Sequence, residues 1–258
     1  YAPPVIYGAS LYQAIFNFRK DKQWKGDIRK YFLDKDGDFD DKKAPFSAAT
    51  KLSSALGSGR LEADTPFEDG GRSIWTVGND PNCPGGLLTK PSSNNNFTKA
   101  NVSKLEKLLF NCESASNATD LIRFVRGADI HNESSDFRTV RDSILGDTFH
   151  SEILFVGAPE AVYSSDSDEN LGKSESYFRF VNGYSTFFEA NKSRRPQIYV
   201  GANDGMLHAF DEDLNERWAF IPPSVTPKLR NMLGVLGSGK SNSVFNVDGP
   251  IVVKDIYI

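Results

Sequence analysis

Alternation of apolar and polar positions dominates the chain and predicts a mainly β protein. Residues 24–34 place a glycine before a run of β-forming residues and lead into an Asp36-Gly37 turn, which predicts a strand entering a hairpin. Residues 72–78 are β-branched and aromatic between glycines and predict a further strand. Residues 44–56 fit either a short strand or a helical turn, whereas residues 79–101 are rich in Pro, Gly, Ser and Asn and predict a surface loop.

The hydrophobic period changes to that of a helix in the next stretch. Two helices are expected there, the first capped by Asn101 and the second by Asn117 or Thr119. Gly127 is suited to the position just after the second helix. Their apolar faces consist of Val102, Leu105, Leu108 and Leu109, and of Leu121, Ile122, Phe124 and Val125. We therefore predict a helical insertion at about residues 99–127 of a β-rich chain.

From residue 145 onward we expect β structure throughout. Val156-Gly-Ala158 recurs as Val200-Gly-Ala202, and we interpret the copies as two strands of one blade, separated by the acidic loop 164–170. Asp204-Gly205 predicts a type I′ turn between two further strands, which would complete a four-stranded antiparallel blade. Residues 24–34 partly repeat this pattern and suggest an earlier blade, and residues 248–258 suggest the next strand.

Composition narrows the class of protein. The 258 residues are 39% hydrophobic and 25% charged, with a mean hydropathy of −0.43, as in ordinary soluble globular proteins. The longest apolar runs have the length of a strand, far below the ~20 residues needed to span a bilayer. The net charge is −4 and the basic residues are scattered, which argues against a nucleic-acid partner. The three tryptophans, Trp24, Trp75 and Trp218, are expected to be core residues.

Alternating carboxylates in residues 34–41 suggest a calcium loop. Calcium loops gather oxygen ligands at alternate positions, and the candidate ligands here are Asp34, Asp36, Asp38 and Asp40. An EF-hand is excluded, because Gly37 is at the fourth place, Lys42 at the ninth, and no glutamate closes the loop. The alternative is a solvated hairpin tip whose charge is offset by neighbouring lysines, and both interpretations stay open.

The two cysteines, Cys83 and Cys112, have flanking residues that fit neither a metal knuckle nor a redox pair. A disulfide between them is our preferred interpretation. Two unpaired buried thiols are the alternative.

Candidate catalytic residues are sparse. The histidines His131, His150 and His208 are far apart in sequence, and a hydrogen-bonded structural role is favoured for His208. No serine lies in a nucleophile elbow and no glycine loop has phosphate-binding register, so we expect no enzyme activity. Arg126-Gly-Ala-Asp129 departs from an Arg-Gly-Asp receptor motif by the inserted alanine, and a helix C-cap explains its glycine.

The densest β segment resembles a known family. Val200-Gly-Ala-Asn-Asp-Gly-Met-Leu-His-Ala-Phe-Asp211 and Trp218-Ala-Phe-Ile-Pro222 closely resemble the signature of the PilC/PilY family, the tip-associated adhesins of type IV pili. Further segments look like that family's propeller in the same order: Trp24-Lys-Gly-Asp-Ile, Arg72-Ser-Ile-Trp-Thr, Leu121-Ile-Arg-Phe-Val-Arg-Gly, Leu145-Gly-Asp-Thr-Phe-His-Ser151 and Val247-Asp-Gly-Pro.

The resemblance implies a fold and a function. The fold is a modified β-propeller of the quinoprotein-like type, with residues 1–258 as the N-terminal part of a domain that is incomplete at its C-terminus. The function is that of a non-enzymatic pilus-tip protein, exported to the cell surface, that supports pilus assembly, retraction control and adhesion. Its expected partners are minor pilins and a host-cell or surface receptor, with no membrane insertion.

Two alternatives to a tip adhesin remain. The strand signature also resembles blades of quinoprotein-type dehydrogenases, although the chain lacks the vicinal cysteine pair of several such enzymes. A pilus-assembly scaffold without an adhesive role is the other alternative. Family members carry a calcium loop that is usually downstream of these blades, and it cannot be placed on any residue of this chain.

Overall fold

The computed structural model describes residues 3–20, 22–55, 71–78, 96–131, 140–141, 143–166, 174–234 and 241–254. The chain divides into two units. The larger consists of Tyr1–Leu154 and Ile198–Ile251, and the smaller of Phe155–Gln197 and Val252–Ile258.

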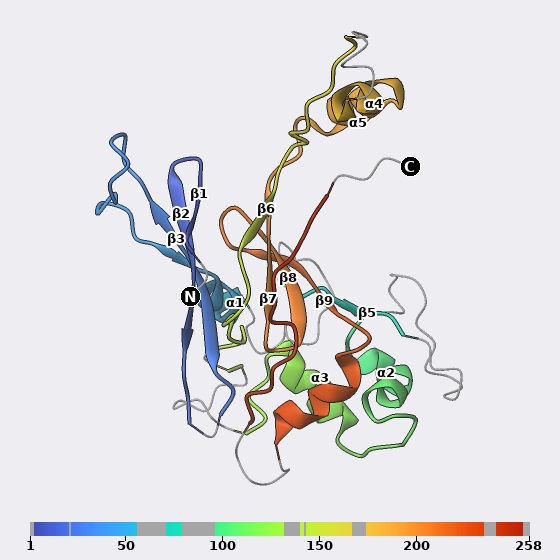
Figure 1. The fold of residues 1–258 in the computed structure, drawn as a ribbon. Coiled ribbons are helices and arrows are strands. Elements are labelled where there is room, and N and C mark those ends of the chain that lie inside the picture. The colour runs from blue at the N-terminus through green and yellow to red at the C-terminus, as the bar shows by residue number, and fades with distance from the viewer. Residues whose placement is uncertain are drawn as a thin grey trace. The chain divides into compact units, whose positions relative to one another are not determined.

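The first sheet of the larger unit has four antiparallel strands in the order β1-β2-β3-β4 (Figure 1, blue). Alternation along the long central pair points Tyr12, Ala14 and Ile28 inward, where each is buried. The sequence predicted one strand and its hairpin here and missed the first two strands. The strands are β1 (Val5–Tyr7), β2 (Ser10–Asn17), β3 (Lys25–Phe32) and β4 (Phe46–Ser47).

Residues 44–56 turn out to hold both of the expected alternatives. The two-residue β4 leads directly into helix α1 (Ala48–Ala55). Ser47 and Asp27 stabilise the start of this helix, because the Asp27 carboxylate accepts hydrogen bonds from Ser47 Oγ and Ala49 N.

The second sheet has five strands in the order β5-β9-β8-β7-β6. The two Val-Gly-Ala copies fall at adjacent strands β6 and β7, as predicted. The sequence predicted a blade of four antiparallel strands. The sheet differs from this prediction because it has a fifth strand, β5, which runs parallel to β9. The strands are β5 (Ile74–Thr76), β6 (Leu154–Val156), β7 (Gln197–Ala202), β8 (Met206–Asp211) and β9 (Glu216–Ile221).

Helices pack against this sheet and share a hydrophobic core with β5, β8 and β9 (Figure 1). Both helices of the predicted insertion are present as α2 (Val102–Leu109) and α3 (Ala118–Arg126), preceded by the short helix η3 (Lys99–Asn101). A further helix, η4 (Thr226–Leu233), was not predicted. Buried side chains from α2, α3, η4, β5, β8 and β9, together with Phe97 and Val225 just before η3 and η4, form one cluster: Ile74, Phe97, Leu105, Leu109, Leu121, Ile122, Phe124, Val125, Met206, Ala219, Ile221, Val225, Leu229, Met232 and Leu233.

The predicted helix ends are correct in position but not in every detail. Asn101 and Asn117 are the N-cap residues of α2 and α3, yet neither side chain makes the capping hydrogen bond. Gly127 ends α3 as predicted, with φ of +120° and its N–H donated to Arg123 O and Phe124 O.

The smaller unit contradicts the expectation of β structure throughout the second half. It contains helices α4 (Glu175–Val181) and α5 (Tyr184–Asn191). The aromatic run in α4 favours a strand by propensity, but Ser174 caps a helix there by accepting a hydrogen bond from Tyr177 N. Gly183, with φ of +80°, then permits the turn into α5.

Other sequence expectations are corrected too. The tryptophans Trp24, Trp75 and Trp218 are half-buried rather than core residues, and Trp75 stacks on Trp218 with ring centroids 6.5 Å apart. Residues 249–254 form no strand, and residues 255–258 lie outside the described part of the chain. None of the helices among the described residues is long and apolar enough to cross a membrane.

Candidate functional site

The hairpin between β7 and β8 differs from its predicted form. A type I′ turn needs positive φ at both central residues, but Asp204 does not have it and only Gly205 does, at +94°. Gly205 N donates to Ala202 O at 3.1 Å, so residues 203–205 form a three-residue link closed by a left-handed glycine. The Asp204 carboxylate accepts from Met206 N at 3.2 Å and from Gly146 N at 2.9 Å. The turn therefore buries a carboxylate instead of exposing it.

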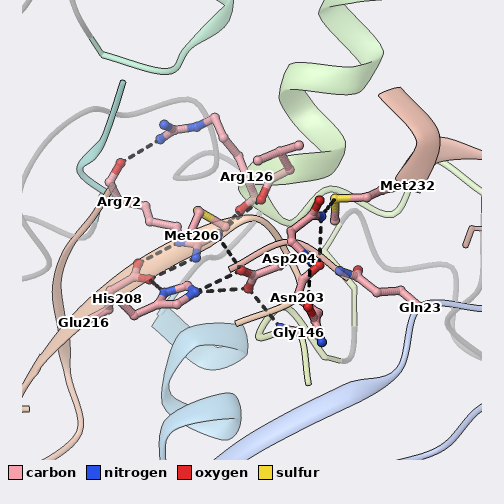
Figure 2. A network of polar contacts seen from close by, with 12 residues as sticks. Gln23, Arg72, Arg126, Gly146, Asn203, Asp204, Met206, His208, Glu216 and Met232 are labelled. Atoms are coloured by element: carbon pink, nitrogen blue, oxygen red, sulfur yellow. Dashed lines mark hydrogen bonds and ion pairs between the residues drawn. The ribbon is translucent and has the colours of Figure 1, made fainter. Parts of the chain in front are cut away.

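His208 lies between two carboxylates at the centre of a buried network (Figure 2). Its Nδ1 is 2.7 Å from Glu216 Oε1, and its Nε2 is 3.1 Å from each oxygen of Asp204. Both ring nitrogens thus face an acceptor, which requires the doubly protonated, positively charged ring. Adjacent antiparallel strands position these groups, since His208 is paired with Ala219 in the register of β8 and β9.

Arg72 completes the network from the other side of Glu216 (Figure 2). Its Nε and Nη2 donate to the two Glu216 oxygens at 2.6 and 2.9 Å, in the bidentate geometry that suits guanidinium and carboxylate. Its Nη1 donates to Arg126 O at 3.0 Å. Arg126 in turn donates to Phe97 O and to Arg72 O, each at 3.0 Å. The two arginines therefore tie the end of α3 to β9 and to the segment before β5.

Four of the charged groups in this buried network contact one another and balance in charge, and the Arg126 guanidinium donates to backbone carbonyls. Arg72 and His208 are cations, and Asp204 and Glu216 are anions. Burial alone would lower the pKa of His208, but the two carboxylates outweigh it and raise the pKa to about 9. Burial opposes the charge of Glu216 as well, yet Arg72 and His208 lower its pKa to about 2. The pKa of Asp204 is lowered for the same reason, chiefly by His208 against the effect of burial. All four groups are thus charged at neutral pH.

A second layer of polar contacts begins at Asn203. Its Nδ2 donates to Asp147 Oδ1 at 2.8 Å and to Asp248 Oδ2 at 3.0 Å, and its Oδ1 accepts from Asn246 N at 2.8 Å. Asp248 also accepts from His150 N and from the His150 ring. Burial, the leading cause, raises the pKa of Asp147. Asn203 therefore joins three chain segments that are far apart in sequence.

Close backbone approach fixes the same region to the first sheet. Gly26 N donates to Leu145 O at 3.0 Å, and a Cβ at Gly26 would lie 1.9 Å from Gly146 O. A Cβ at Gly146 would lie 2.3 Å from Asp204 N. Only glycine fits at these two positions, because any side chain would overlap backbone atoms.

The β8–β9 turn makes a second link to the first sheet. Tyr12 Oη donates to Glu212 O at 2.8 Å, and Lys30 Nζ donates to Asp213 Oδ1 at 2.8 Å. The hydrogen bond from Lys30 is the main cause that lowers the pKa of Asp213. Lys51 also donates to Asp213 O. The two sheets are thus joined at both ends of β8.

This arrangement suits structural stabilisation rather than proton transfer. His208 is fully buried, and both of its nitrogens are occupied by carboxylates, so no ring nitrogen faces a substrate. The predicted hydrogen bonding of His208 is confirmed, and these contacts favour a structural role. The sequence did not predict its partners Asp204 and Glu216, which lie 4 and 8 residues away. It also did not predict Arg72, which binds Glu216 across 144 residues of sequence. One sequence feature could have indicated the network: Glu216 is a charged residue at an inward-facing position of the predicted strand, so it needs a buried partner of opposite charge.

The calcium candidates at residues 34–41 form an exposed turn. Asp34 Oδ1 accepts from Asp36 N at 2.9 Å and from Asp38 N at 3.0 Å. Lys35 pairs with Asp36 at 3.0 Å, and Lys43 pairs with Asp40 at 3.2 Å. Among the residues that the structure describes, no group of three His, Cys, Asp or Glu side chains could hold a metal ion. Calcium binding by Asp34, Asp36, Asp38 and Asp40 stays a prediction.

The remaining sequence candidates are placed as follows. Cys112 is disulfide-bonded, whereas Cys83 lies outside the described residues, so their pairing stays a prediction. Arg126 and Asp129 are buried, and Gly127 ends a helix, which supports the C-cap interpretation over a receptor motif. His131 Nε2 is 2.7 Å from Leu233 O.

Comparisons with known proteins identify the family. The model of the PilY1 beta-propeller domain matches residues 145–257, which include Asp204, His208 and Glu216. The chain is 36% identical over 248 residues to type IV pilus biogenesis factor PilY1 of Pseudomonas aeruginosa strain PAK, covering 93% of this chain. The chain carries a PilY1/PilC-family domain.

Other PilY1 proteins are similar to smaller extents. The protein of P. aeruginosa strain UCBPP-PA14 is 30% identical over 250 residues, which is 93% of this chain. A PilY1 homolog of Xylella fastidiosa is 32% identical over 164 residues, which is 62% of this chain. The chain spans only 19%, 18% and 12% of the lengths of these three relatives. No solved structure matches the chain.

Proposed function

We propose that this chain is a non-enzymatic propeller segment of a type IV pilus tip-associated protein that supports pilus assembly, controls retraction and contributes to adhesion. The observation that carries the proposal is the 36% identity over 93% of the chain to a protein named type IV pilus biogenesis factor PilY1. The name of this relative supports a pilus-associated role. The tip position and the adhesive role are proposed from the family resemblance described in the sequence analysis.

The buried network supports a mechanical role. Four balanced charges tie β8, β9, the Arg72 segment and the Asp204 turn together in the interior. Partnered, buried charges have a strict geometry, which favours one arrangement of the strands over its alternatives. Such a segment keeps its loops in place for a partner while the filament extends and retracts.

The fold part of the proposal is a modified propeller of the quinoprotein-like type. The two sheets would be blades, with residues 1–258 as the N-terminal part of the domain and 99–127 as an insertion. Blades that pack side by side leave variable loops at the rim for partners.

The proposed location is extracellular, at the pilus tip, after export through the periplasm. The proposed partners are minor pilins and a host-cell or surface receptor. Calcium held by Asp34, Asp36, Asp38 and Asp40 is the less favoured of the two interpretations of this turn, because it rests on their alternation alone and the aspartates already bond to backbone N–H groups and to lysines.

A quinoprotein-type dehydrogenase is not favoured, because the matching relatives are named biogenesis factors and His208 has no nitrogen facing a substrate. A pilus-assembly scaffold without an adhesive role is the second candidate function. A strain that lacks this segment separates the two candidates, because normal attachment by cells that still have pili would favour the scaffold.

Immunogold electron microscopy of native cells, with an antibody against this segment, tests the location. Gold at filament tips is the expected result. Label confined to the periplasm, away from pili, would overturn the tip assignment. A deletion strain that lacks the protein is the control, and it should show no gold label.

A further inference from the structure

An aromatic cluster lies at the surface of the larger unit and is connected to the Asn203 contacts only through His150 and Asp248 among the bonds described above. Five rings form a closed circuit: Phe16–Trp24 at 6.2 Å, Trp24–Phe245 at 6.1 Å, Phe245–His150 at 6.2 Å, His150–Phe149 at 4.3 Å and Phe149–Phe16 at 5.0 Å between centroids. Phe18 joins this circuit through Trp24, at 5.1 Å. We call these six residues the aromatic cluster. They come from three segments distant in sequence, so only the fold brings them together.

Much of this cluster is exposed to solvent. Phe18 and Phe245 are 62% and 61% exposed, and Phe149 is 37% exposed. The His150 side chain is 59% exposed, and its ring is held by the buried Asp248 carboxylate at 2.9 Å. Contiguous exposed rings cost hydration free energy, and they mark interaction surfaces when several gather at one place.

The chain segment that supplies Phe18 and Trp24 differs in charge from the chain as a whole. The segment from Phe18 to Lys25 carries four basic residues and one acidic residue, a local charge of +3, whereas the chain as a whole carries −4. The basic residues are Arg19, Lys20, Lys22 and Lys25. A pocket of about 550 Å³ adjoins the cluster through Phe16 and Lys25, and it is also lined by Asp27 and Arg29. Lys25, Asp27 and Arg29 are the charged residues of this lining and give it a net charge of +1, with Arg29 paired to Asp27.

Ring geometry favours a polypeptide over a sugar. A sugar stacks on one open, flat aromatic face, but Phe16 lies nearly parallel to Trp24, at 19°, and Phe18 and Phe245 meet Trp24 at steep angles. The cluster therefore offers an irregular apolar surface that side chains can interdigitate with. Lys20 and Lys22, which lie between Phe18 and Trp24 in the sequence, complement carboxylates.

We propose that the aromatic cluster and the adjoining basic segment dock an acidic polypeptide segment of a partner protein, whose apolar side chains contact the rings while its carboxylates face Lys20 and Lys22. This inference is independent of the pilus assignment, because it rests on ring contacts, exposure and local charge alone.

Site-specific photo-cross-linking in native cells tests the proposal with the full-length protein. The photoreactive residue p-benzoylphenylalanine replaces Phe18 or, separately, Phe245, since both are exposed and similar in size to the replacement. The same substitution at Phe39, which is 58% exposed on the acidic turn, is the position control. Mass spectrometry then identifies the cross-linked peptide.

The expected adduct joins either position to another protein, at a peptide with more Asp and Glu than Lys and Arg, and is absent at Phe39. Charge reversal in Lys20→Glu/Lys22→Glu should reduce its yield about fivefold. The matched reversal Lys35→Glu/Lys42→Glu, on the acidic turn, should leave the yield unchanged. Unchanged thermal unfolding of both double variants excludes misfolding as the cause.

Several results would overturn the proposal. Adducts only within the same polypeptide would mean that the cluster is covered by the protein itself. A cross-linked peptide that is neutral or basic, adducts only to glycan or lipid, no adduct at either cluster position, or insensitivity to Lys20→Glu/Lys22→Glu would each contradict an acidic polypeptide partner.

Discussion

Two Asp-Gly turns in this chain have the same local signal and opposite surroundings. At residues 34–41, Gly37 has φ of +87°, and Asp34, Asp36 and Asp38 are exposed while Asp40 is half-buried. These aspartates bond to neighbouring backbone and to lysines. At residues 203–205, Gly205 has φ of +94°, but Asp204 is buried and contacts His208, Met206 and Gly146. Equivalent dipeptides therefore provide a solvated tip in one place and an interior charge in the other.

The comparison shows that an ion pair's contribution to the free energy of unfolding depends on whether it is exposed or buried. An exposed ion pair contributes about 0–1 kcal/mol because water already solvates both partners. A buried charge that loses its partner is left without solvation, so removing the partner is costly. The comparison can be tested by making matched changes in the two turns and their neighbourhoods.

The largest effect is expected from Glu216→Gln. This change leaves Arg72 and His208 buried with one carboxylate fewer between them, and it should lower the free energy of unfolding by about 3–5 kcal/mol. Urea denaturation followed by tryptophan fluorescence measures the change. The matched substitution on the exposed turn, Asp36→Asn, should cost less than about 0.5 kcal/mol. Equal effects for the two variants would contradict the comparison.

A smaller effect is expected from glycine substitutions. Gly146→Ala places a Cβ 2.3 Å from Asp204 N, and the forced shift should cost about 2–3 kcal/mol. Gly37→Ala meets no atom within 4 Å, but its φ of +87° strains an L residue, so we expect a cost of about 1 kcal/mol. Gly249→Ala has neither problem and serves as the control in the same thermal-unfolding series. A tolerated Gly146→Ala would show that the turn is not fixed by close packing.

Stability should also depend on pH through the buried network that includes Asp204, His208 and Glu216. His208 has a folded pKa of about 9, above its ordinary value of 6.5, so its contribution is complete below pH 6.5 and is lost as pH rises through 9. Glu216 has a folded pKa of about 2, below its ordinary 4.5, so its contribution is present above pH 4.5 and lost as pH falls through 2. The raised pKa of Asp147 acts oppositely, since it favours the folded state in acid.

The urea midpoint should therefore decrease between pH 6.5 and pH 9. Measurements at several pH values should show a flatter profile for His208→Gln in this range, whereas Asp36→Asn should keep the wild-type slope. A wild-type midpoint that is constant from pH 6.5 to 9 would argue against a charged His208.

The smallest effect concerns calcium at the exposed turn. Its aspartates already bond to backbone N–H groups and lysines, so we expect millimolar calcium to leave the melting temperature unchanged. Thermal unfolding with and without calcium measures this. A calcium-dependent rise that Asp38→Asn removes would instead make residues 34–41 a calcium loop.

The sequence predicted local structure better than tertiary pairing. Alternation and β propensity indicated β3, β5, β7, β8 and β9, and the apolar spacing indicated α2 and α3, because these signals are local. α4 was missed because its aromatic residues favour strands, and the Ser174 cap that opposes them is a weak signal.

The same limit applies to the candidate site. His208 and the Asp204 turn were noticed individually, but their burial depends on Arg72 and Glu216 meeting across 144 residues, which no local pattern encodes. The aromatic cluster was missed for the same reason, since Phe16, Phe149 and Phe245 become neighbours only in the folded chain.

The most direct test of the central claim, that His208 is a buried cation locked between two carboxylates, is an NMR titration of the histidine rings with nitrogen-15 labelling. With three histidines in the chain, His208→Gln assigns its signal by loss. The account predicts a ring protonated on both nitrogens at neutral pH, titrating near pH 9. A His208 ring that titrates near pH 6.5, or that is neutral at pH 7, would contradict it.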